Sequence, residues 1–314
     1  MFQQIQKLDR VTLVAPLGLR FSDSASGTFI GDGLDVQVYP PGSPSRRVPA
    51  IANRKGVYVL HHASGLRELE HGEGDQAFWD HLPPARDFVI EVNDNARRFQ
   101  PFQFIAGLPA RGLYEWMDPT LSSPLTPATS IPLYSSPVRA VPAGMAVVRA
   151  DLWDASKDIA ASWAVMEASL NDRIIARGIA DEQGRIALIF PYPAPRSFSI
   201  SSPPGSPLGS PPTANTLALT EQVWSIRLRA FYTPDRPIAS PPNALESKRA
   251  LPDLRFTLAQ PEATIWTDTT FNEPLLEAPL QYGHELALQS KAATSPPSQL
   301  RQSVLFITPA GSPP

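Results

Sequence analysis

The stretch ARGIADEQGRIALIFPYP, residues 176–193, decides the fold class of this chain. A charged four-residue turn, DEQG at 181–184, separates two apolar runs, and two prolines close the second run. Short apolar runs joined by polar turns are typical of antiparallel strands. Gly184 supplies the positive φ that the last position of such a turn commonly needs. We interpret the turn as a corner of a β-scaffold rather than as a functional site.

The same pattern recurs along the chain. NRKG at 53–56 is a second polar turn that ends in glycine before an apolar run. The run at 162–172 has residues that also favour helix, but the Asn-Asp pair that follows is a hairpin signal and favours strand. Strands are predicted at residues 34–40, 56–62, 87–94, 102–108, 145–154, 162–172, 173–181, 185–193 and 222–232.

Proline sets the domain organisation, because its 36 copies lie in clusters between the apolar runs. Each proline removes a backbone donor and fixes φ, which argues against long helices and central strands. The densest cluster, residues 119–142, suits an extended linker or strap. Only residues 65–82 have a helical pattern, which indicates a short insertion between strands.

The sequence therefore predicts an all-β protein of two β-sandwich domains joined by a proline-rich linker, with a C-terminal extension. The expected boundaries are residues 1–118 for the first sandwich, 119–142 for the linker, 143–260 for the second sandwich and 261–314 for C-terminal strands and a proline-rich tail. The apolar segments after Asp253 either complete the second sandwich or form an extension that packs on a neighbour.

Charge and composition exclude several classes of protein. The net charge is −3, spread evenly over both halves, so a nucleic-acid partner is not expected. Cysteine is absent, which excludes a disulfide framework and a cysteine nucleophile. The first residues lack the pattern of a signal peptide, and no apolar run has the length of a membrane span. We expect a cytoplasmic protein, with membrane association only as part of a larger particle.

Candidate catalytic and metal motifs fail on spacing. Four of the five histidines fall between His61 and His81 among acidic residues, which leaves a metal-dependent hydrolase open, but a solvated polar loop is the default. HEL at 284–286 lacks the second histidine of a metalloprotease helix, and the glycines at 27–33 lack a phosphate-binding fingerprint. We assign no catalytic, cofactor-binding or metal residues, expect no small-molecule substrate and predict that the protein is not an enzyme.

Five residues are candidates for partner binding. Tyr114, Trp116 and Met117 precede the proline-rich segment and are expected to form an exposed anchor. Val304 and Phe306 lie in the run VLFIT at 304–308, which is expected to pair with a sheet, either the protein's own or a partner's.

Two family resemblances accompany these patterns. Strand, glycine turn and strand, in both halves, resembles transthyretin-like and carboxypeptidase-regulatory-like sandwiches. The order of VTLVAPLGLRFSDSASGTFIGDGLDVQVYPPG, NRKGVYVLHHASGLRELE, IARGIADEQGRIALIFPYPAP and LTEQVWSIRLRAFY resembles accessory proteins of bacterial contractile injection systems, the phage-tail-like particles.

The second resemblance implies a non-enzymatic structural subunit at the baseplate periphery, involved in anchoring the particle to a membrane, with the cap as the other location. Its partners would be baseplate, sheath or cap proteins. A second hypothesis is a carbohydrate-binding or adhesion module, which would display Tyr114, Trp116 and Tyr134 as an exposed aromatic platform.

Overall fold

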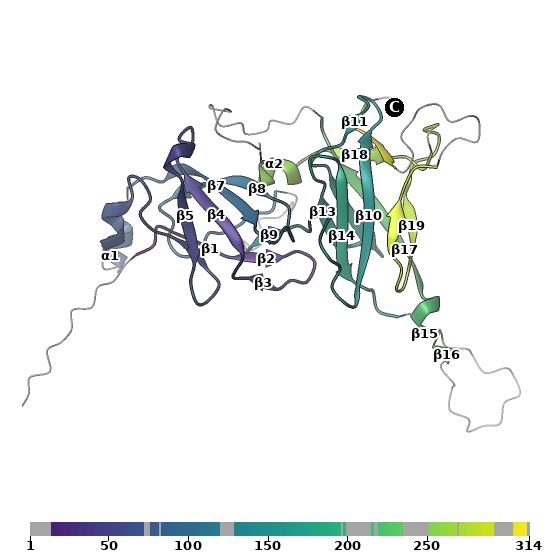
Figure 1. Cartoon of the computed structure of the whole chain (residues 1–314), viewed down its shortest axis with the longest axis horizontal. Coiled ribbons are helices and arrows are strands. Elements are labelled where there is room, and N and C mark those ends of the chain that lie inside the picture. Colours follow the sequence, from purple (N-terminus) through teal and green to yellow (C-terminus); the bar gives the residue numbers. More distant parts are fainter. Residues whose placement is uncertain are drawn as a thin grey trace, which may run out of the picture.

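The computed structural model describes residues 14–71, 76–81, 83–119, 129–195, 197–198, 215–216, 219–234, 251–268, 270–291 and 304–312. These residues form two β-sandwiches that lie side by side, with a few short helical segments (Figure 1). The predicted all-β class is confirmed.

The first sandwich packs a six-stranded sheet against a small three-stranded sheet. The larger sheet has the order β1-β6-β5-β4-β7-β8, and the smaller one has the order β3-β2-β9. The strands are β1 (Leu17–Leu19), β2 (Phe21–Asp23), β3 (Phe29–Ile30), β4 (Leu34–Tyr39), β5 (Val48–Ala52), β6 (Tyr58–Leu60), β7 (Arg86–Asp94), β8 (Phe102–Leu108) and β9 (Ile131–Leu133). The helical segments η1 (Pro44–Arg46), η2 (Arg67–His71) and α1 (Gln76–Asp80) flank this sandwich, and the last two confirm the predicted insertion.

The second sandwich is one long sheet curled around its own core. Its main path runs β11-β10-β21-β18-β17-β12-β13, with β14 and β20 also paired to β10, and β19 paired to β17. The strands are β10 (Met145–Asp154), β11 (Ile159–Ala160), β12 (Val165–Leu170), β13 (Arg173–Ile179), β14 (Arg185–Pro191), β17 (Val223–Phe231), β18 (Glu262–Ile265), β19 (Glu277–Gln281), β20 (Leu286–Leu288) and β21 (Leu305–Thr308). A separate pair, β15 (Ser197–Phe198) with β16 (Asn215–Thr216), follows β14, and η3 (Leu219–Glu221) precedes β17.

Strand β17 shows how alternating apolar and polar residues produce a strand with one buried face. In β17, Trp224, Ile226, Leu228 and Ala230 are buried and the residues between them are exposed, as the sequence predicts. The strand prediction for residues 162–172 is confirmed by β12, and the turn after it has Asn171 and Asp172 at φ 51° and 60°. Two successive residues with positive φ form the hairpin turn that Asn and Asp tolerate.

Residues 119–142 were expected to form a linker, but the part of this segment that the structure describes contains a strand. Residues 131–133 form β9, which pairs in parallel with β2, and Ile131 and Leu133 lie in the first core. Pro132 is tolerated because β9 is the edge strand of the three-stranded sheet, so its missing donor breaks no ladder bond. The first sandwich therefore extends beyond the predicted boundary at residue 118. Residues 120–128 lie outside the described part.

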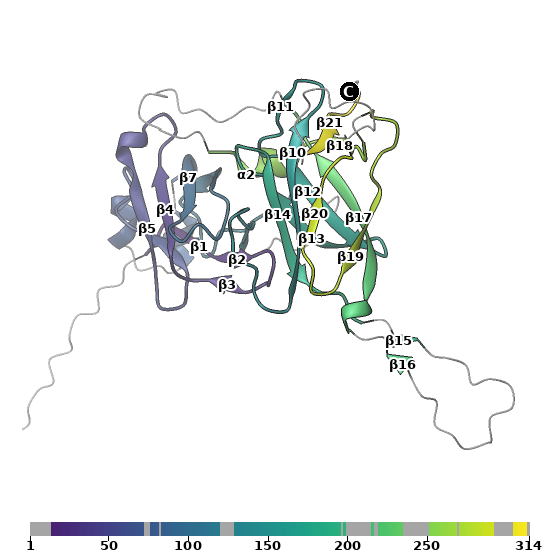
Figure 2. The ribbon, with the colours of Figure 1, turned by 45° about the vertical axis from the view of Figure 1, so that its right-hand side comes forward.

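The segments after Asp253 complete both sandwiches rather than form an extension. Strands β18, β19, β20 and β21 belong to the second sheet, as Figure 2 shows. The segment before them forms helix α2 (Leu254–Leu258), because the Asp253 side chain caps it by accepting from Arg255 N and Phe256 N. Leu254 and Leu258 lie in the core of the first sandwich, so the chain returns to that sandwich after building most of the second.

Candidate functional site

The two sandwiches meet through a packed junction. Strand β12 sends Met166 and Ala168 into the core of the second sandwich and turns Val165 and Glu167 toward the first. Val165 and its neighbour Ile179 on β13 join the hydrophobic core of the first sandwich. Both faces of β12 are therefore buried, which explains why its sequence does not alternate.

Arg177 is the centre of a buried charge cluster in this junction. On β13 it stands opposite Glu167 of β12, and its guanidinium lies 2.6 Å from Glu167 Oε1 and 2.9 Å from Asp118 Oδ2. The Arg177 and Glu167 side chains are 14% and 6% exposed. Burial raises the pKa of the neighbouring Tyr134 to about 12, so its hydroxyl is neutral. Burial alone would lower the pKa of Arg177, but Tyr134, Glu167 and Asp118 outweigh it and raise that pKa.

Two further arginines connect the segment that crosses between the sandwiches, around residues 137–139, to both sandwiches. Arg139 forms a bidentate pair with Asp23 of β2, with N–O distances of 2.9 and 2.6 Å. Arg149 of β10 donates to the backbone oxygens of Pro137 and Arg139. The two side chains connect β2, the crossing segment and β10 in one chain of hydrogen bonds.

Three glutamine side chains add hydrogen bonds to backbone carbonyls across or beside the junction. Gln100 Nε2 donates to Ile179 O over 3.3 Å, and Gln103 Nε2 donates to Leu251 O over 3.1 Å. Gln260 Nε2 donates to Trp163 O over 3.0 Å. All three bonds are buried, so breaking any of them would leave polar groups unsatisfied.

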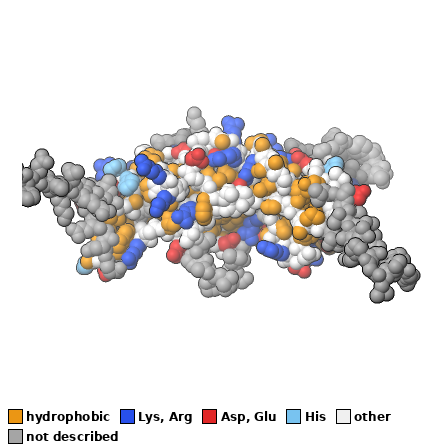
Figure 3. Space-filling model, turned by 90° about the horizontal axis from the view of Figure 1, so that it is seen from below, with side chains coloured by type: hydrophobic (Ala, Val, Ile, Leu, Met, Phe, Trp, Pro, Cys, Tyr) orange, Lys and Arg blue, Asp and Glu red, His pale blue; other side chains and the backbone are white. Residues whose placement is uncertain are grey.

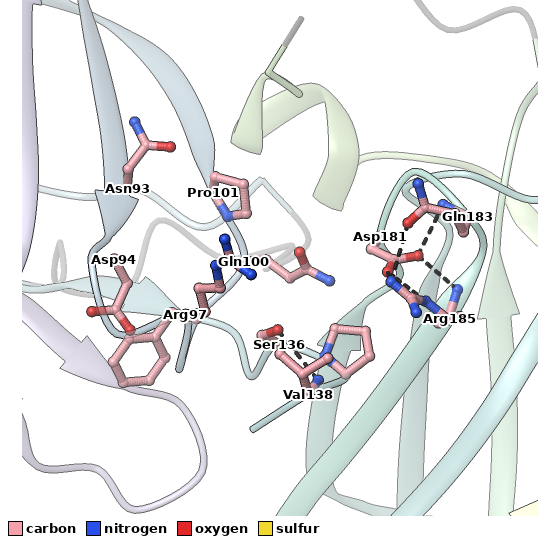
Figure 4. A pocket seen from close by; sticks show the side chains of 12 residues that line it. Asn93, Asp94, Arg97, Gln100, Pro101, Ser136, Val138, Asp181, Gln183 and Arg185 are labelled. Atoms are coloured by element: carbon pink, nitrogen blue, oxygen red, sulfur yellow. Dashed lines mark hydrogen bonds and ion pairs between the residues drawn. The ribbon is translucent and has the colours of Figure 1, made fainter. Parts of the chain in front are cut away.

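A cleft of about 440 Å³ opens at the edge of this junction (Figure 4). Its walls come from both sandwiches. The lining residues are Asn93, Asp94, Arg97, Phe99, Gln100, Pro101, Ser136, Pro137, Val138, Asp181, Gln183 and Arg185.

Two turns of similar construction face each other across the cleft, one after β7 and one between β13 and β14 (Figure 4). Asp181 accepts from the backbone of Gln183 and Arg185 and from the Arg185 guanidinium. Asp94 accepts in the same way from the backbone of Arg98 and from its guanidinium. These hydrogen bonds raise the pKa of Arg185 and of Arg98. Each carboxylate thus braces its own turn.

Gly184 has two reasons to be glycine. Its φ is +79°, and a Cβ at this position would lie 2.3 Å from Leu152 O. The predicted corner is therefore confirmed, and it also forms one wall of the cleft. Arg97 and Arg185 both line the cleft, but the Arg185 guanidinium is bonded to Asp181, and both aspartates are committed to their turns.

The predicted anchor at residues 114–117 is divided between core and surface. Trp116 is only 2% exposed and packs edge-on against Phe104, so the expectation that it is exposed is wrong. Tyr114 is half-buried, and its hydroxyl accepts from Arg255, whose guanidinium also lies over the Trp116 ring. Of the three predicted anchor residues, Met117 is the one that is well exposed, at 60%.

The aromatic platform expected for a carbohydrate module is not assembled. Trp116 is buried, and Tyr134 is 3% exposed beside Arg177 in the junction. A sugar-binding platform needs exposed ring faces, which these two residues do not offer.

Val304 and Phe306 lie against the protein's own sheet. Strand β21 pairs with β10 and with β18, and both side chains are buried with Trp153 in a small cluster. Residues 304–308 were expected to pair either with the protein's own sheet or with a partner's sheet, and in the structure they pair with the protein's own sheet. The buried side chains present no docking surface to a partner in this arrangement.

The histidine-rich loop is organised around one buried carboxylate. Glu70 is 1% exposed, accepts from the His62 backbone and lies 3.4 Å from His62 Nδ1. His81 is engaged elsewhere, with the Ala77 carbonyl. In the described part of the chain, no three His, Cys, Asp or Glu side chains are close enough together to hold a metal ion. The His71 side chain lies outside that part.

The sequence interpretation missed the junction arginines. The one available signal was Arg177 itself, a charged residue among Ala and Gly in a strand predicted as apolar. Such a residue on a buried strand requires a partner.

Comparisons with known proteins give little further information. No protein-family model and no curated protein matches the chain. Among solved structures, it is similar to the shaft pilin spaA from Lactobacillus rhamnosus GG, with 8% identity over 95% of this chain and 98% of that chain and a TM-score of 0.22. A TM-score this low supports no inference about function. No helix in the described ranges is both long and apolar enough to cross a membrane.

Proposed function

We propose that this protein is a non-enzymatic structural subunit of a multi-protein particle. The observation that carries the proposal is the junction, in which the mostly buried Arg177 pairs with Glu167 and Asp118. Beside this cluster, Val165 and Ile179 of the second sandwich pack in the core of the first. Buried charges cost free energy unless their geometry is fixed, so such a cluster holds the sandwiches at one angle. A subunit that sets spacing in an assembly needs that fixed angle.

The particle we propose is a contractile injection system, on the strength of the family resemblance in the sequence. The subunit would sit at the baseplate periphery and take part in anchoring the particle to a membrane, with the cap as the other location. Its neighbours would be baseplate, sheath or cap proteins. Exposed Met117 and the surfaces around it are the predicted contact region that the fold leaves accessible.

The test is recovery of the tagged protein from its native cells, followed by mass spectrometry and negative-stain imaging of the material that accompanies it. Co-purification with sheath, tube or baseplate proteins is the expected result. An equally tagged, unrelated protein from the same cells is the control. Recovery of a lone monomer in repeated preparations, at low salt and after cross-linking, would overturn the proposal.

A further inference from the structure

A second concavity lies at the end of the first sandwich, away from the junction cleft. It has a volume of about 580 Å³ and is lined by Arg46, Arg47, His62, Arg67 and the turn that contains Ser64 and Gly65. Strand β5 begins there and β6 ends there. Figure 3 shows the molecule from below, with Lys and Arg side chains spread over both sandwiches and histidines at the left end.

Residues 62–67, which form about half of the pocket lining, are fixed by hydrogen bonds to groups beneath the surface. The Glu70 carboxylate accepts from the His62 backbone and faces its ring, and Leu66 N donates to Ala63 O. His62 and Gly65 both have positive φ, at 62° and 81°, which turns the chain around the pocket rim. The rim is thus shaped by hydrogen bonds that do not use its arginine side chains.

The balance of charge in the pocket is positive. Arg47 is neutralised by Glu91, which lies 2.8 Å away and also accepts from the Tyr39 hydroxyl. Arg46 and Arg67 form no ion pair with any residue of the described part of the chain, and both are exposed. The Arg86 guanidinium lies beside the rim, 3.9 Å from the position that a Cβ on Gly65 would occupy, but Arg86 is not one of the residues that line the pocket.

The acidic groups near the pocket do not cancel this charge. Glu70 is buried beneath His62, and Glu91 is committed to Arg47. Glu68 on η2 and Asp87 on β7 are exposed and are not among the residues that line the pocket. The pocket therefore holds more guanidinium groups than its own carboxylates satisfy.

We propose that this pocket binds a phosphate group. Guanidinium groups suit phosphate because their planar donors pair with two oxygens at once. A ligand with two negative charges also matches several cations better than a ligand with one carboxylate does. The volume admits a free phosphate or the headgroup of an anionic phospholipid. This inference is independent of the proposed function, since it rests on the pocket alone.

The test pairs two double variants that remove the same charge. Arg46→Gln with Arg67→Gln empties the pocket of its unpaired cations. Arg54→Gln with Lys55→Gln removes two exposed cations from the turn at the opposite end of β5 and β6. Binding of inorganic phosphate is measured by calorimetry and by NMR shifts, and binding to vesicles of phosphatidylcholine with or without phosphatidic acid is measured by sedimentation.

The wild-type chain is expected to bind at least one of the two phosphate sources. The pocket variant should bind about tenfold more weakly, while the turn variant binds within about twofold of wild type. Binding of phosphate in solution assigns a soluble ligand, and binding only to vesicles that contain phosphatidic acid assigns a lipid headgroup. Failure of the wild type to bind either source, or equal losses in both variants, would overturn the proposal. Thermal unfolding of each variant confirms that it is folded.

Discussion

The arginines of the junction and those of the terminal pocket contrast in how their charge is satisfied. Arg177 and Arg139 are mostly buried, and each lies within 3 Å of a carboxylate oxygen. Arg46 and Arg67 are exposed around a concavity and have no carboxylate partner in the described residues. The same side chain therefore holds the fold together in one place and remains available to a ligand in the other.

The difference shows that pairing, rather than residue type, separates structural from functional candidates in this protein. A buried pair costs several kcal/mol to break because the remaining charge is left without a partner. An exposed, unpaired arginine costs almost nothing to replace. Measurements of stability therefore distinguish the two kinds of arginine.

The largest effect is expected for Arg177→Met. The change leaves Glu167 and Asp118 without their cation in the junction, and we expect the free energy of unfolding to fall by ~3 kcal/mol. Arg173→Met is the matched control, because Arg173 is exposed on the same strand and should change stability by less than ~0.5 kcal/mol. Urea unfolding of both variants is the measurement. Equal losses in the two would show that the cluster contributes nothing specific.

A smaller, pH-dependent effect is expected for Asp23→Asn. Burial alone would raise the pKa of Asp23, but hydrogen bonds from Arg139, Ala25 N and Ser26 bring it below its ordinary value of 3.8. A carboxyl whose pKa is lowered by folding stabilises the protein above the pKa of the unfolded chain, and this contribution is lost as pH falls through the folded pKa.

Wild type should therefore exceed Asp23→Asn in stability by ~2 kcal/mol at neutral pH, which is the scale of a hydrogen bond to a charged group. The difference should shrink below about pH 4, the ordinary range of an aspartate. Chemical unfolding at a series of pH values gives the difference directly. A gap that stays constant into acid would contradict the assignment.

The smallest effect is expected for the pocket variant, Arg46→Gln with Arg67→Gln. Because neither side chain pairs with a described residue, the free energy of unfolding should change by less than ~0.5 kcal/mol, and relief of repulsion favours a slight gain. A loss comparable to that of Arg177→Met would mean that these arginines hold structure, and the contrast between the two regions would fail. Thermal unfolding at low and high salt separates the charge effect from packing.

Local pattern predicted much of this fold. The strands β4 and β17, the turn at Asn171 and Asp172 and the corner that ends in Gly184 all follow from a few adjacent residues. Strand period and turn chemistry are set within such short windows, so the sequence contains the whole signal.

The features that the sequence did not predict depend on distant partners. Ile131 and Leu133 look like part of a proline-rich linker until β2 is known to lie beside them. Leu254 and Leu258 read as part of the second sandwich, although they pack in the first. Trp116 stands next to an exposed residue and was expected at the surface, but Phe104 and Arg255 cover it. Pairings between residues this far apart leave no local periodicity.

The return of the chain to the first sandwich has a consequence for synthesis. Gln103 on the outermost strand β8 bonds to the backbone of Leu251 and Pro252, and α2 closes the core beside it. As the ribosome releases the chain from its N-terminus, the first sandwich emerges long before these residues do. Its strand β8 then has an open edge until most of the second sandwich has been translated, and open edges invite pairing with other chains. Maturation of the N-terminal half is thus coupled to completion of the C-terminal half.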